Sequence, residues 1–86
     1  MGRGAGGRGT GGVAQIPEQI GAAVRRAVTM FRADGQSGID WVYNNVLSAD
    51  DKRAFDAYLV GSRHPLAYEP GTNWQRFNAF VREEAG

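Results

Sequence analysis

The sequence predicts an all-α fold: a small bundle of about four short helices that follows a Gly/Arg-rich N-terminal tail. Apolar residues recur at helical spacing in separate segments, and these segments are bounded by residues typical of helix termini. No stretch shows the strict alternation of apolar and polar residues expected of a half-buried strand. We therefore divide the chain into a tail, residues 1–14, and a helical domain, residues 15–86.

Glycine dominates the tail. Seven of the eleven residues from Gly2 to Gly12 are glycine, which gives the backbone great conformational freedom and leaves few side chains to bury. We expect this segment to be flexible and disordered, with two positive charges, Arg3 and Arg8.

The first helix is predicted over residues 17–33. Pro17 is acceptable in a first turn, and Gly35 lies just past the end, where glycine commonly stops a helix. One apolar stripe is formed by Ile20, Val24, Ala27, Val28 and Phe31. Polar side chains on the opposite face are Arg25, Thr29 and Arg32.

The second helix is predicted over residues 37–47. Ser37 followed by Asp40 resembles a capping box, in which the side chains of the two residues bond to each other's backbone N–H groups. The apolar stripe of this helix consists of Ile39, Val42, Tyr43, Val46 and Leu47.

Two further helices are predicted over residues 49–60 and 72–84. Ser48 with Asp51, and Thr72 with Gln75, give each a capping-box start. A loop containing His64 connects them. The residues expected to face the core are Phe55, Tyr58 and Leu59 in the third helix, and Trp74, Phe77, Phe80 and Val81 in the fourth.

Composition argues against catalysis and against bound metals or cofactors. The chain has no Cys, which excludes thiolate metal sites, and only one His. Asp50 and Asp51 fall in the first turn of a predicted helix, where carboxylates stabilise the helix dipole. We expect a non-enzymatic protein without a cofactor.

No apolar run approaches the roughly 20 residues that a membrane-spanning helix needs. The chain begins with glycines and arginines, and no apolar signal-peptide core follows. Together with the absence of Cys, these features favour a cytoplasmic location.

Trp41 suggests a partner-binding surface. At 100° per residue it points away from the apolar stripe of the second helix and shares its side with Asn44, Asn45 and Ser48. A large anchor among small polar residues is typical of an interaction hot spot. Alternatively, Trp41 fills a second seam between helices. The favoured hypothesis is a small protein-binding module, such as an adaptor, inhibitor, effector or assembly component, whose partner is unidentified.

The alternative is a nucleic-acid-associated protein that uses a basic surface made of Arg3, Arg8, Arg25 and Arg32. Eight basic and nine acidic residues from Ala14 onward give the body a net charge of 8 − 9 = −1, which disfavours this alternative. The second and third helices have a spacing close to that of a helix-turn-helix. However, Asp50 and Asp51 would open the recognition helix and repel phosphates.

Overall fold

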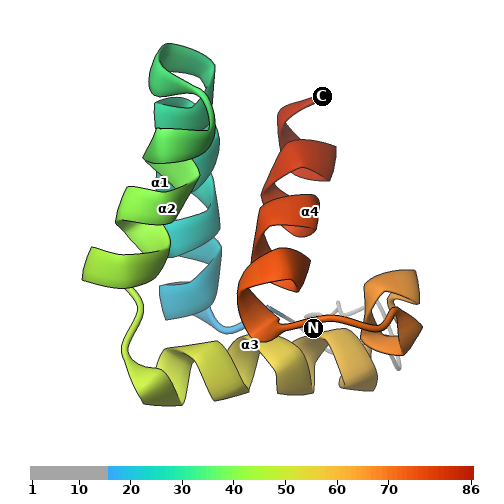
Figure 1. Ribbon diagram of the computed structural model, residues 1–86. Coiled ribbons are helices and arrows are strands. Elements are labelled where there is room, and N and C mark those ends of the chain that lie inside the picture. The colour runs from blue at the N-terminus through green and yellow to red at the C-terminus, as the bar shows by residue number, and fades with distance from the viewer. Residues whose placement is uncertain (1–15) are drawn as a thin grey trace, which may run out of the picture.

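The computed structural model describes residues 16–86, which form four α-helices and one short 3-10 helix (Figure 1). The elements are α1 Glu18–Asp34, α2 Gln36–Asn45, α3 Ala49–Gly61, η2 Pro65–Tyr68 and α4 Asn73–Ala85. The all-α prediction is confirmed for this part of the chain. The tail predicted for residues 1–14 lies outside the described residues.

Helices α1 and α2 form an antiparallel pair, α4 stands beside them, and α3 crosses the same end of all three (Figure 1). A single residue, Gly35, separates α1 from α2. Its φ of 71° and ψ of −146° lie in a region that essentially only glycine occupies. The chain therefore reverses direction within one residue.

The α1–α2 pair packs unusually closely because Gly38 has no side chain. A Cβ placed on Gly38 would lie 2.4 Å from the carbonyl oxygen of Met30 in α1. Glycine is therefore required at this crossing, and the crossing fixes which residues of α2 face α1.

The core is apolar and is contributed by all four α-helices. Phe55 in α3 packs edge-to-face on Phe77 and Phe80 of α4, with ring centroids 5.5 and 5.4 Å apart. Such aromatic pairs stabilise a fold by more than the burial of their apolar surface alone. The buried apolar residues are Ile20, Ala23, Val24, Ala27, Ile39, Val42, Leu47, Phe55, Leu59, Phe77, Phe80 and Val81.

Two of the three predicted capping boxes are present. The Ser48 side chain accepts from the Asp51 backbone, the Thr72 side chain accepts from the Gln75 backbone, and both reciprocal bonds are formed. The third prediction, at Ser37, is wrong. Helix α2 begins one residue earlier, at Gln36, and its N-cap is Gly35, which has no side chain to accept a hydrogen bond. The hydroxyl of Ser37 instead donates to the Asp34 carbonyl at 3.0 Å.

The expectation that Trp74 is a core residue is also wrong. Its side chain is 38% exposed, whereas Phe77, Phe80 and Val81 of the same helix are buried. Trp74 lies in the first turn of α4, and its indole N–H donates to Asp40 Oδ1 of α2 at 3.0 Å. An indole N–H needs an acceptor, and this one finds it at the edge of the bundle.

Polar contacts anchor the first turn of α4 to α2 and α3. Tyr43 Oη donates to Asn73 Oδ1 at 2.7 Å, and Asn73 Nδ2 donates to the Lys52 carbonyl at 3.0 Å. One turn further on, Arg76 Nε donates to Asp56 Oδ1 at 3.1 Å. These contacts fix α3 across the end of the other helices.

Candidate interaction surface

Trp41 lies on the outer side of α2 and is 43% exposed. The guanidinium carbon of Arg26, in α1, is 4.9 Å from the centre of the indole ring. This distance is within the range of a cation–π interaction. The contact of Trp41 with the neighbouring helix α1 is therefore made by the charged, exposed side chain of Arg26.

The other three residues predicted with Trp41 are also exposed. Asn44 and Asn45 lie in the last turn of α2, and Ser48 is the N-cap of α3. Asn45 Nδ2 donates to the Trp41 carbonyl at 2.9 Å. We call Trp41, Asn44, Asn45, Ser48 and Arg26 the Trp41 surface.

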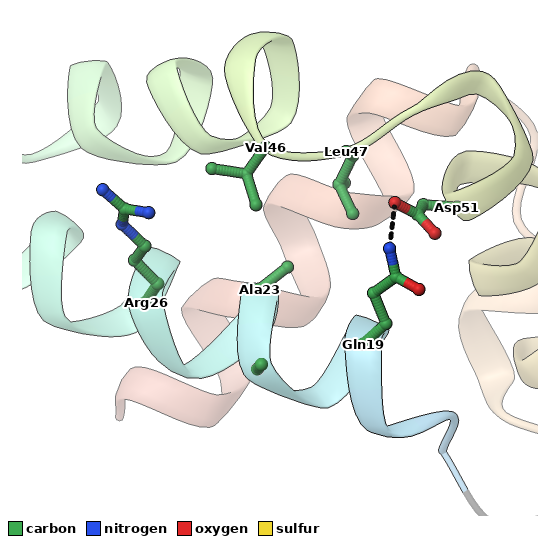
Figure 2. A pocket seen from close by; sticks show the side chains of 7 residues that line it. Gln19, Ala23, Arg26, Val46, Leu47 and Asp51 are labelled. Atoms are coloured by element: carbon green, nitrogen blue, oxygen red, sulfur yellow. Dashed lines mark hydrogen bonds between the residues drawn. The ribbon is translucent and has the colours of Figure 1, made fainter.

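A shallow hollow of about 230 Å³ adjoins this surface, between α1 and the residues that follow the end of α2, and we call it the α1–α2 groove. Figure 2 shows Gln19, Ala23 and Arg26 along α1, opposite Val46 and Leu47, with Asp51 at one end. Arg26 belongs to both the groove and the Trp41 surface. The volume is below the roughly 300–1,000 Å³ of typical small-molecule pockets, so the groove has room for a side chain of a partner.

The two charged residues of the groove differ in their surroundings. Asp51 is only 9% exposed, and its Oδ2 accepts from Gln19 Nε2 at 3.2 Å and from the Ser48 backbone N–H at 3.1 Å. Arg26 is exposed and takes part in none of the ion pairs formed within residues 16–86. The accessible charge of the groove is therefore positive.

Sequence reasoning missed Arg26 and the groove. In the sequence, Arg26 is one of several polar residues on the solvent face of the first helix. Its position over Trp41 depends on how α1 and α2 cross, which the contact between Gly38 and Met30 determines. Gly35 and Gly38, three residues apart at the helix junction, were the available signal for a close crossing.

The predicted basic surface is only partly within the described residues. Arg25 and Arg32 are exposed on α1 and line a second hollow together with Thr29 and Glu84. Arg32 Nη2 donates to the Ala85 carbonyl at the end of α4, at 2.9 Å. The structure thus brings these two arginines to one hollow but adds a carboxylate to it. Arg3 and Arg8 lie outside residues 16–86.

His64, the one histidine of the sequence, has partners within the chain. His64 Nδ1 accepts from the Leu66 backbone N–H at 3.1 Å, Nε2 is 3.3 Å from Glu83, and the ring lies against Phe80. Residues 16–86 contain no group of three or more potential metal ligands. In the same range, no helix combines the length and the apolar character needed to cross a membrane.

Comparison of the chain with protein-family models, with curated proteins and with solved structures finds no significant match.

Proposed function

We propose that this chain is a small, non-enzymatic protein-binding module whose partner docks on the Trp41 surface. The observation that carries the proposal is the cation–π contact of Arg26 with the ring of Trp41, a residue that remains 43% exposed. Tryptophan and arginine are among the residues most enriched in binding hot spots, where a few side chains provide most of the affinity. An adaptor, an inhibitor, an effector and an assembly component would all act through such a surface.

The Arg26–Trp41 contact also prepares the surface for binding. Immobilising a flexible side chain at an interface costs about 0.5–1.5 kcal/mol. Because Arg26 already holds one face of the indole, less of this cost remains when a partner arrives. Asn44, Asn45 and Ser48 provide the polar rim that commonly surrounds a hot spot.

Site-specific photocrosslinking in native cells tests the location of this surface. A photoreactive amino acid is placed at Asn44 or Asn45 of the full chain, both of which are exposed beside Trp41. Val60 and Tyr68, which are 61% and 71% exposed, are the matched control positions because they are the most exposed large apolar residues among residues 16–86.

We expect one protein adduct from positions 44 and 45 that disappears when Trp41→Ala is added. Adducts formed only from positions 60 and 68 would place the interface on the α3–η2 side instead. The absence of any protein adduct at positions 44 and 45 would contradict the proposal.

A nucleic-acid-associated role is the second candidate. It is favoured by the hollow that Arg25 and Arg32 share, to which the tail residues Arg3 and Arg8 would add charge. Glu84 in the same hollow weakens its attraction for phosphates. The described residues carry eight basic and nine acidic side chains, so their net charge is 8 − 9 = −1 and the overall field does not favour nucleic acid.

A further inference from the structure

Arg26 retains hydrogen-bonding capacity that the fold does not use for ion pairing. The guanidinium carbon lies 4.9 Å from the centre of the Trp41 ring, and this cation–π contact provides no oxygen acceptor for the five N–H donors of the group. Among residues 16–86 no carboxylate forms an ion pair with Arg26. An arginine fork held in this way is suited to a carboxylate from outside the chain.

The apolar walls of the groove lie next to this arginine. Ala22 and Ala23 of α1 face Val46 and Leu47, which follow from the end of α2. The alanines leave the hollow open, and the two larger residues give it an apolar wall. In Figure 2 the Arg26 and Asp51 side chains lie at opposite ends of the groove.

We propose that the α1–α2 groove binds a protein segment in which an apolar side chain lies close to an acidic one. The apolar side chain enters between Ala23 and Val46, and the carboxylate pairs with Arg26. This inference rests on the proposed function and specifies the chemistry of the partner.

Charge complementarity selects an acidic partner over a basic one. A basic segment would meet the charge of Arg26, and like charges at an interface are strongly unfavourable. Asp51 offers little compensation, because it is nearly buried and its Oδ2 already accepts hydrogen bonds from Gln19 and Ser48.

Random-peptide display on the full chain tests this inference without a known partner. Peptides are selected on the wild type, synthesised, and measured by fluorescence anisotropy against Arg26→Ala and Ala22→Leu. Ala22 is exposed on the groove wall, so leucine there fills the groove without entering the core. Arg25→Ala is the matched control, because Arg25 is the adjacent arginine and lines the other hollow.

We expect the selected peptides to combine Asp or Glu with an apolar residue within about one helical turn. Arg26→Ala and Ala22→Leu should each weaken binding at least tenfold, and Arg25→Ala less than twofold. Arg26→Glu should reverse the preference, so that the same peptides bind again when their acidic residue is replaced by lysine.

Three outcomes would each overturn the inference. The selected peptides could lack carboxylates, they could bind Arg26→Ala and the wild type with equal affinity, or no sequence could be selected at all. Adducts at positions 44 and 45 that require Trp41 but not Arg26 would refute this inference and leave the proposed function standing. The absence of any protein adduct from positions 44 and 45 of the otherwise unchanged chain would refute both.

Discussion

The backbone of Gly38 in α2 lies directly against the carbonyl of Met30 in α1, so closely that a Cβ on Gly38 would be 2.4 Å from that oxygen. Trp41 follows Gly38 by three residues, and Arg26 precedes Met30 by four. In an antiparallel helix pair these offsets bring the two side chains together. The tight crossing therefore places Arg26 over the Trp41 ring.

Gly38→Ala should destabilise the domain, because the new methyl group would overlap backbone that cannot move aside freely. Overpacking of this kind costs about 1–3 kcal/mol. Gly21→Ala in α1 is the matched control: its Cβ would be 3.4 Å from the flexible end of Arg25. Alanine is favoured over glycine inside helices by about 0.5–1 kcal/mol, so this variant should be as stable as the wild type or slightly more stable. Urea unfolding followed by circular dichroism measures both, and a Gly38→Ala variant as stable as Gly21→Ala would be inconsistent with the close crossing.

The aromatic residues should differ in their contribution to stability according to burial. Phe77 is fully buried, and its replacement by Ala should cost about 3–5 kcal/mol, enough to unfold much of a domain this small. Trp41→Ala should cost only about 1 kcal/mol, since it removes a partly exposed ring and one cation–π contact. The cost of Trp74→Ala should lie between these two values. The Trp74 ring is also partly exposed, but the substitution removes its hydrogen bond to Asp40 as well. Denaturant unfolding at neutral pH provides the comparison; equal losses for Trp41→Ala and Phe77→Ala would assign Trp41 to the core.

Local sequence signals predicted the helices well. They predicted poorly which side chains meet between helices. Capping at Ser48 and Thr72 and burial of Phe55 follow from patterns within one segment, so they could be predicted. The exposure of Trp74 could not, because helical spacing places it on the apolar side, and its hydrogen bond to Asp40 joins two helices, α4 and α2.

The same distinction applies to the candidate site. Trp41, Asn44 and Asn45 share a side of α2 by their spacing alone, and this was visible in the sequence, whereas Ser48 lies beyond the end of α2 and caps α3. The position of Arg26 over Trp41 arises from the packing of α1 on α2, and the groove arises from the packing of α1 on the α2–α3 connection and the first turn of α3. Spacing within one helix carries no information on that packing.

The Asp56–Arg76 pair should make stability depend on pH. Burial alone would raise the pKa of Asp56, but hydrogen bonds from Arg76 and Asn73 and the charge of Arg76 together lower it below its usual 3.8. Ionised Asp56 therefore stabilises the fold above about pH 4, and this contribution is lost as the pH falls through the lowered pKa.

Asp56→Asn should consequently lower the free energy of unfolding at pH 7 by about 1 kcal/mol, a modest value because the Asp56 side chain is 35% exposed. The difference from the wild type should shrink at pH 2–3, where the native carboxylate is also becoming protonated. Urea unfolding at both pH values checks this, and a difference that does not change with pH would contradict the assignment.

Nucleic acid should bind weakly. With Glu84 beside Arg25 and Arg32, and without net positive charge on the described residues, any affinity for DNA or RNA should come from a few phosphate contacts. Such binding weakens steeply with salt. Fluorescence anisotropy of the full chain with duplex DNA and single-stranded RNA should show no binding at physiological salt. Submicromolar affinity there would favour the nucleic-acid role over the proposed one.

The central claim is that Trp41 anchors a protein partner, and the most direct test is the Kd of the crosslinked partner for wild type and Trp41→Ala. Loss of a hot-spot residue costs about 2 kcal/mol or more, so the Kd should rise by about 30-fold or more. Tyr68→Ala, which removes the most exposed of the large apolar side chains in the described chain, should leave the Kd unchanged. Isothermal titration calorimetry on variants with wild-type helical content measures this. A Trp41→Ala variant that binds with the wild-type Kd would contradict the account.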